Sequence, residues 1–316
     1  MRALVAAIVV AASATASAGG GRLPATNRIE FRAGHPGDIL VGTTFGFLVS
    51  HDSGATWRYM CPVAAHYDGT FDPDYAYSAN GLIAVTSFDG VAVMRDGCTF
   101  APTPLLAEFA SQLELDHQGG LDVALADPAA SAIAHSPDDG LTFPQVTTIG
   151  VGGDWWQSLL VSGDGVRIYV SGYRAHELDD SILLLESHDG GASFAAMAAV
   201  GLTTTSTSTV DLVAIDPNLP QRIYARVNEA VMGHYDFYRS DDAGASWTPI
   251  AAIVDQVGPP SLLARTNDML VLGARSSGMR VSTTHGDAWS QVGCPLHVGC
   301  LAESPSGEVW ACTKNY

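Results

Sequence analysis

The sequence predicts an all-β fold, a β-propeller of four-stranded antiparallel blades with six complete blades and part of a seventh. Three observations predict it. An eight-residue pattern recurs along the chain at a nearly constant interval. Short runs of β-forming residues, bounded by turn signals, precede each clean copy of the pattern. No window shows the sustained 3.6-residue periodicity of an amphipathic helix.

The recurring pattern is an octapeptide, Ser-x-Asp-x-Gly-x-Ser/Thr-Trp/Phe. Its four clean copies occupy residues 50–57, 136–143, 187–194 and 240–247. Two degenerate copies carry Arg95 and Thr284 where the aspartate stands, so we expect them to lack its acceptor. The glycines of successive copies are 42 to 53 residues apart, which is the length of a four-stranded propeller blade.

Each recurring position of the octapeptide has a physical role in a tight turn. The aspartate accepts hydrogen bonds from backbone N–H groups, and the glycine adopts a positive φ. The terminal aromatic side chain is expected to bury between neighbouring strands. We therefore interpret these positions as structural. They are Asp52, Gly54, Trp57, Asp138, Gly140, Phe143, Asp189, Gly191, Phe194, Asp242, Gly244 and Trp247.

The fifth repeat gives the order of strands within one unit. Runs at residues 210–215, 222–227 and 237–240 precede its octapeptide, and a fourth strand is expected after the aromatic residue. Six octapeptides therefore predict six blades.

The end of the chain predicts the start of a seventh blade. Residues 299–304 and 308–313 are its expected first and second strands, with no seventh octapeptide after them. We expect the single propeller domain, residues 19–316, to end mid-blade. Either residues 22–26 add a strand that closes the ring, or the natural chain continues past Tyr316. We favour continuation, because an open blade leaves strand edges unpaired.

The first 18 residues have the features of a secretory signal peptide. Arg2 forms the basic region, residues 3–12 form an apolar run, and Ala16-Ser17-Ala18 forms a small-residue cleavage site. A buried N-terminal helix is the alternative, but the run lacks a polar face. We expect cleavage near Ala18 and a periplasmic or extracellular protein, with no transmembrane segment later in the chain.

Export makes the five cysteines disulfide candidates, because compartments beyond the cytoplasmic membrane are oxidising. Proximity in sequence favours pairing Cys61 with Cys98, and one further pair among Cys294, Cys300 and Cys312. No C-x-x-C is present and no histidine pair has zinc-finger spacing, so we expect no metal site.

Charge excludes several partner classes. The chain has 33 acidic and 15 basic residues and a formal net charge of −18, so nucleic acid and anionic membranes are poor partners. The phosphate-binding loop, the G-x-S-x-G elbow and the H-E-x-x-H zinc motif are all missing from the sequence. We predict no bound cofactor.

On its octapeptides the chain resembles the Asp-box, or BNR-repeat, β-propellers. That family includes sialidases, sortilin-type receptor domains, xyloglucan-cleaving hydrolases and photosystem II assembly factors. The resemblance covers roughly residues 27–316. It implies that ligands meet the face opposite the octapeptides, at loops joining second and third strands and at loops joining one blade to the next.

Those loops hold aromatic residues beside charged ones, which suits carbohydrate binding. Blade four is the richest, and the alternative there is that Trp155 and Trp156 pack the wall of the blade. The ligand-face candidates are Tyr67, Asp154, Trp155, Trp156, Tyr173, Arg174, His176, Glu177, Asp180, Glu229 and Tyr235.

Two functions remain open from the sequence. We favour a secreted, non-catalytic binding or scaffold propeller that recognises a glycan or an extracellular protein. The alternative is a glycoside hydrolase, which needs two carboxylates flanking the scissile bond. No pair stands out among the loop acids, and the sialidase Phe/Tyr-Arg-Ile-Pro segment is incomplete, because Phe31-Arg32 is followed by Ala33-Gly34.

Overall fold

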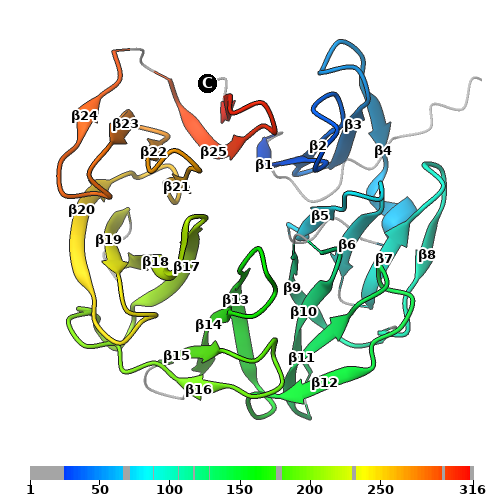
Figure 1. Cartoon of the computed structure of the whole chain (residues 1–316), viewed down its shortest axis with the longest axis horizontal. Helices are drawn as coiled ribbons and strands as arrows, with labels where there is room; N and C mark the ends of the chain where they lie inside the picture. Colours follow the sequence, from blue (N-terminus) through cyan, green and yellow to red (C-terminus); the bar gives the residue numbers. More distant parts are fainter. Residues whose placement is uncertain are drawn as a thin grey trace, which may run out of the picture.

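The computed structural model describes residues 25–66, 72–87, 89–105, 107–116, 118–127, 129–175, 180–229, 233–293 and 296–313. They form a ring of small sheets around a central axis (Figure 1). Six sheets have four antiparallel strands each, joined in chain order, and we number them blades one to six. Within these ranges the one helical element is the short 3-10 helix η2 (Pro62–Ala65). The predicted all-β propeller with six four-stranded blades is confirmed.

The strands of blades one to three are β1 (Thr26–Phe31), β2 (Ile39–Thr43), β3 (Gly46–Ser50), β4 (Arg58–Met60), β5 (Tyr75–Tyr77), β6 (Ile83–Ser87), β7 (Gly90–Met94), β8 (Phe100–Pro102), β9 (Ala110–Leu115), β10 (Leu121–Ala126), β11 (Ser131–Ser136) and β12 (Gln145–Thr148). Those of blades four to six are β13 (Asp154–Val161), β14 (Ile168–Ala175), β15 (Asp180–Ser187), β16 (Ala195–Ala196), β17 (Thr209–Asp216), β18 (Leu219–Asn228), β19 (His234–Ser240), β20 (Thr248–Val254), β21 (Ser261–Ala264), β22 (Leu270–Ala274), β23 (Gly278–Ser282) and β24 (Ser290–Gln291).

Adjacent blades pack against each other through apolar side chains. Strand β6 is buried along its whole length. Between blades two and three, Val91 and Val93 of β7 share a core cluster with Leu121 and Val123 of β10. The ring is therefore stabilised by burial between blades, because a single blade cannot cover both of its own faces.

The four clean octapeptides form the same hydrogen-bonded turn. In the first, Thr56 donates its backbone N–H to Asp52 Oδ1 (2.7 Å) and its hydroxyl to Asp52 Oδ2 (2.6 Å). Ser50 accepts the Gly54 N–H (2.9 Å), and Gly54 has a φ of +85°, which favours glycine. The same acceptor contacts are made by Asp138, Asp189 and Asp242.

The two degenerate octapeptides correct one expectation, because both retain a turn acceptor. The hydroxyl of Thr284 accepts the Ala288 N–H (2.9 Å). In the other copy, Asp96 accepts the N–H groups of Cys98 (2.9 Å) and Thr99 (2.8 Å). The acceptor there has moved one residue along the chain, past Arg95.

The octapeptide aromatic is buried in two copies and partly buried in three, the latter being Phe143, Phe194 and Trp289, but in the first copy it is exposed. Phe100 and Trp247 are 7% and 5% exposed, and each packs in a cluster that includes the preceding blade. Trp57 is 39% exposed, so the expectation that it buries between strands is wrong. The sheet that precedes blade one around the ring has two strands instead of four.

That two-stranded sheet consists of β25 (Val298–Glu303) and β26 (Val309–Thr313). It lies between blades six and one, because β25 contacts β21, β22 and β1 (Figure 1). The rings of Phe31 in β1 and Trp310 in β26 meet edge to face with centroids 5.5 Å apart.

A disulfide between Cys300 and Cys312 joins β25 to β26, with Cα atoms 4.8 Å apart. This confirms one pair among the three C-terminal cysteines. The expected Cys61–Cys98 bond is wrong, since both thiols are free and exposed. Cys98 lies in an octapeptide turn, whereas Cys61 follows β4, which leads away from such a turn. Cys294 lies outside the described residues.

Two further expectations concern the membrane and the N-terminus. Within the described ranges, no helix has the length and apolar character needed to cross a bilayer. The expected signal peptide, residues 1–18, lies outside them.

Candidate functional site

A cavity of about 580 Å³ lies at the centre of the ring. We call it the central cavity. It is lined mainly by the first strands β1, β9, β13, β17 and β25, with the beginning of β21. The innermost strand of each blade faces the axis, and alternate residues of a strand point to opposite sides. The side chains of these strands therefore decide what the cavity can bind.

One wall of the central cavity holds a compact charged group, the Arg28 cluster, made of Arg28, Glu30, Asp74 and Glu114. The Arg28 guanidinium forms ion pairs with Asp74 and with Glu30 (Nε–Oε1, 2.5 Å). It lies 3.8 Å from Glu114 (Nη2–Oε2). Asp74 is held in place, because its Oδ2 accepts the Leu113 N–H (3.0 Å). A single guanidinium thus faces three carboxyl groups.

This imbalance changes how the carboxyl groups ionise. Burial raises the pKa of Glu114 to about 8; the Arg28 charge lowers it, while Glu30 and Asp74 raise it further. Burial also raises the pKa of Glu30, against the opposing effect of Arg28. Although burial alone would lower the pKa of Arg28, the three carboxylates raise it. At neutral pH Glu114 therefore holds a proton.

On β17 and β18, Arg226 and Asp211 form an internal ion pair in the lining. Arg226 Nη1 also donates to the Pro260 carbonyl (2.7 Å), and Asn228 Nδ2 donates to Asp211 Oδ2 (3.0 Å). This pair is satisfied within the protein. The excess of negative charge in the cavity belongs to the Arg28 cluster.

The lining is also apolar in part. Trp155 of β13 is 38% exposed, and its ring meets that of Phe109 with centroids 4.9 Å apart. Leu160 and Leu262 line the same space. The cavity therefore offers an aromatic and aliphatic surface close to carboxyl groups.

Two side-chain amides in the lining have buried atoms without a partner. They are Asn27 Oδ1 and Nδ2 and Gln157 Oε1, for which the described part of the protein supplies no hydrogen bond. Buried polar atoms are normally paired. These amides are thus available to water or to a bound molecule.

Some of the blade-four candidates pack within the protein, and one lines the central cavity. Asp154 and Arg174 pair with each other through Nε–Oδ1 (2.5 Å) and Nη2–Oδ2 (2.7 Å), and Asp154 is 2% exposed. Trp156 is fully buried in a core cluster, as the packing alternative expected. Trp155 lies opposite Tyr173 in the sheet and, of the candidates whose side chains the structure describes, is the one in the cavity lining.

The remaining candidates are not brought to the cavity. Glu229, whose N–H donates to the His234 carbonyl (3.1 Å), and Tyr235 lie where β18 turns into β19, outside the lining. Tyr67, His176 and Glu177 lie outside the described residues, as does the side chain of Asp180.

Sequence reasoning missed the whole Arg28 cluster. Three of its members lie in the first strands β1 and β9, and Asp74 directly precedes the first strand β5. The available signal was charge within the first strand of a repeat, such as Glu114, the one charged residue in the run ASQLEL. Because the first strands of a propeller face the axis, charges there point to the centre.

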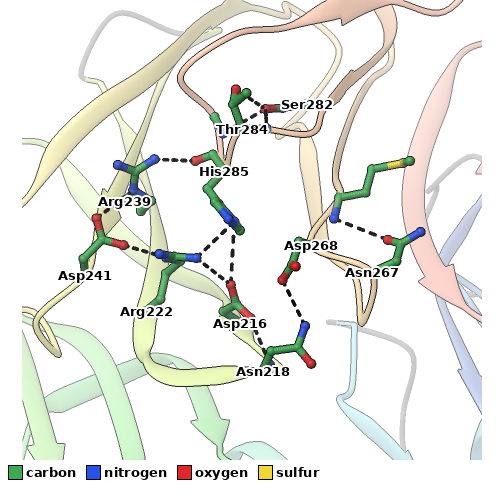
Figure 2. A network of polar contacts seen from close by, with 12 residues as sticks. Asp216, Asn218, Arg222, Arg239, Asp241, Asn267, Asp268, Ser282, Thr284 and His285 are labelled. Atoms are coloured by element: carbon green, nitrogen blue, oxygen red, sulfur yellow. Dashed lines mark hydrogen bonds and ion pairs between the residues drawn. The ribbon is translucent and has the colours of Figure 1, made fainter.

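A second polar network lies on the octapeptide face, the end of the ring that carries the octapeptide turns. Figure 2 shows Arg222 between Asp216, Asp241 and His285. Arg222 Nε contacts Asp241 Oδ1 (2.5 Å), and Nη1 contacts Asp216 Oδ2 (3.2 Å) and His285 Nδ1 (3.1 Å). Arg239 donates to the His285 carbonyl (2.8 Å). Since these contacts join blade five to the octapeptide of blade six, the network stabilises the ring.

No group of three or more histidine, cysteine or acidic side chains suited to a metal ion occurs in the described ranges.

Comparison with known proteins supports the fold. No protein-family model and no curated protein matches the chain. Among solved structures, the chain is similar to the GH74 xyloglucanase from Xanthomonas campestris (14% identity, TM-score 0.60), covering 83% of this chain but 45% of the xyloglucanase. It is also similar to YCF48 bound to D1 peptide (14%, 0.58), over 92% of this chain and 91% of that one. A streptogramin B lyase matches similarly (11%, 0.61), over 92% and 90%. Identities this low establish the β-propeller fold alone.

Proposed function

We propose that the protein is a non-catalytic binding propeller that takes a polypeptide segment in its central cavity. The observation that carries the proposal is the lining, which places Trp155 and aliphatic side chains close to the Arg28 cluster. Such a surface suits a chain with both apolar and polar side chains. The partly exposed Trp155 would be the anchor, because aromatic residues dominate the energetics of binding sites.

A match to a peptide-bound propeller over nearly the whole of both chains supports the proposed binding role. YCF48, which matches over 91% of its length, is described as bound to a peptide. The xyloglucanase is matched over less than half of its length, so most of that enzyme has no counterpart here. We take the first as the better guide.

A glycan is the second candidate ligand, because Trp155 can stack on a sugar face while the carboxyl groups accept from hydroxyls. Hydrolysis of such a glycan would need an acid with a raised pKa beside an ionised carboxylate. Glu114, whose pKa is raised to about 8, would be the acid, and the carboxyl group of Asp74, which contacts Arg28, lies in the same cluster. Turnover of chromogenic glycosides that is lost in Glu114→Gln would favour this candidate.

We also propose that the chain is a secreted Asp-box propeller. The repeated turn around Asp52 supports the family, and the Cys300–Cys312 disulfide supports an oxidising compartment. The sheet of β25 and β26 would be the first half of a seventh blade. Its place between blades six and one, and the exposure of Trp57, support this assignment.

Two tryptophans of equal exposure test the binding site. Trp155 in the cavity is 38% exposed and Trp57 near the octapeptide face is 39% exposed. We expect Trp155→Ala to weaken binding to hits from a peptide array by about 10-fold or more, a typical effect of losing an aromatic anchor. Trp57→Ala is the control and should bind normally. Equal affinity of both variants would overturn the proposal, and hits confined to a glycan array would favour the glycan.

A further inference from the structure

We infer that the anchoring group of the ligand is a lysine ammonium, held in the central cavity against Glu30 and Glu114. The inference rests on the proposed function, since it assumes that a polypeptide enters the cavity. It goes further by naming the side chain that the Arg28 cluster selects.

The first argument is charge. The lining contains four carboxyl groups and two guanidinium groups, and Arg226 is already paired with Asp211 and the Pro260 carbonyl. Around Arg28, three carboxyl groups share one positive charge. These side chains are shielded from bulk water in part, and partial shielding of an excess of negative charge favours binding of a proton or of a counter-charge. A cationic ligand supplies the counter-charge.

The second argument is shape. A lysine has a four-carbon stem that packs on apolar surface while its ammonium reaches a polar group. Trp155, Leu160 and Leu262 offer the apolar surface, and the Arg28 cluster lies in the same lining. Arg28 already uses Glu30 Oε1, so Glu30 offers a ligand one oxygen rather than a free bidentate carboxylate. A single oxygen suits a compact ammonium better than the planar fork of arginine.

The third argument predicts a linked proton. The charged groups facing Glu114 are Arg28 and Glu30 from β1 and Asp74, which directly precedes β5. With a pKa of about 8, Glu114 is protonated in the empty cavity at neutral pH. An ammonium lowers that pKa, so binding releases a proton to solvent. Affinity therefore rises with pH through 8, and it falls again only when the lysine amine itself deprotonates near pH ~10.4.

The experiment uses the blocked peptide acetyl-Gly-Lys-Gly-amide and the full chain. Its affinity is measured by NMR titration at pH 6.5 and 8.5. One linked proton with a pKa near 8 predicts binding about 25-fold tighter at pH 8.5. The same peptide with an acetylated lysine amine, which is neutral, should bind much more weakly and without dependence on pH.

Two variants separate a specific role from a general effect of charge. Glu114→Gln keeps the side-chain volume and should abolish most of the pH dependence. Glu308→Gln removes an exposed carboxylate from the β25–β26 turn and should leave affinity and pH dependence unchanged. Circular dichroism of both variants checks that the sheets are intact.

The outcomes distinguish the inference from the function beneath it. If the acetylated peptide binds as tightly as the free amine at both pH values, the ammonium inference is wrong while polypeptide binding stands. If glucosamine binds and neither peptide does, polypeptide binding is wrong and the lysine assignment falls with it. If neither peptide binds and glucosamine does not bind either, both polypeptide binding and the lysine assignment are overturned.

Discussion

Two seams between sheets contain the same octapeptide aromatic in different surroundings. At the seam of blades four and five, Trp247 is 5% exposed, shares a cluster with Tyr169 and Met197, and donates from Nε1 to the Gly244 carbonyl (3.1 Å). At the seam of the two-stranded sheet and blade one, Trp57 is 39% exposed. The comparison teaches that the octapeptide sets a local turn, whereas the neighbouring sheet decides how much the aromatic stabilises.

The largest expected difference between the seams is in the tryptophans themselves. Trp247→Ala should lower the free energy of unfolding by about 3 to 5 kcal/mol, the usual cost of removing a buried aromatic. Trp57→Ala should lower it by less than about 1 kcal/mol, as is normal for exposed positions. Urea denaturation of both variants measures the difference. Equal losses would mean that Trp57 is covered in solution.

The Cys300–Cys312 disulfide lies in the two-stranded sheet, on the other side of the seam from Trp57. Cys300 and Cys312 are 12 residues apart, and closing a loop of that length stabilises by about 3 kcal/mol. The double variant Cys300→Ser, Cys312→Ser should therefore lower the free energy of unfolding by up to that amount. Cys98→Ser, which removes an exposed free thiol, should leave the unfolding curve in place. A double variant as stable as the parent would contradict a stabilising role for this bond.

The smallest expected effect is on the stability of the fold at low pH. Two hydrogen bonds from Ser193 lower the pKa of Asp189 to about 2. The bond from the Ser193 hydroxyl has the larger effect on this pKa, and the bond from its backbone N–H has the next largest. A depressed pKa means that the ionised turn stabilises the fold above the ordinary pKa of 3.8, and that this contribution is lost as pH falls toward 2. Thermal melts between pH 5 and 2 should thus converge for the parent and Asp189→Ala. A constant gap in melting temperature would contradict the linkage.

The architecture was predictable because its signal is local and repeated. Each octapeptide contains its own turn, and the interval between octapeptides fixes the number of strands in a blade. The same reasoning wrongly placed Trp57 in a buried position. A sequence pattern does not report how many strands the neighbouring sheet has. The pairing of Cys61 with Cys98 was wrong for a similar reason. It rested on proximity in sequence, which does not tell which end of a blade each residue occupies.

The site was harder to predict, because its members come together across blades. Arg28 and Asp74 are 46 residues apart and meet only when two blades stand side by side. Trp155 was found because aromatic residues at a strand entrance are visible in the sequence. Glu114 was missed because an acid inside a strand resembles a solvated position until the axis of the ring is known.

The central cavity draws its walls from strands that are far apart in the sequence. Arg28 lies in β1, and Leu301 lies in β25. A proteolytically shortened product that lacks β25 would have one side of the cavity missing. Capture by an immobilised ligand would therefore separate molecules that contain β25 from fragments that lack it, and ligand binding would report on whether this part of the ring is present.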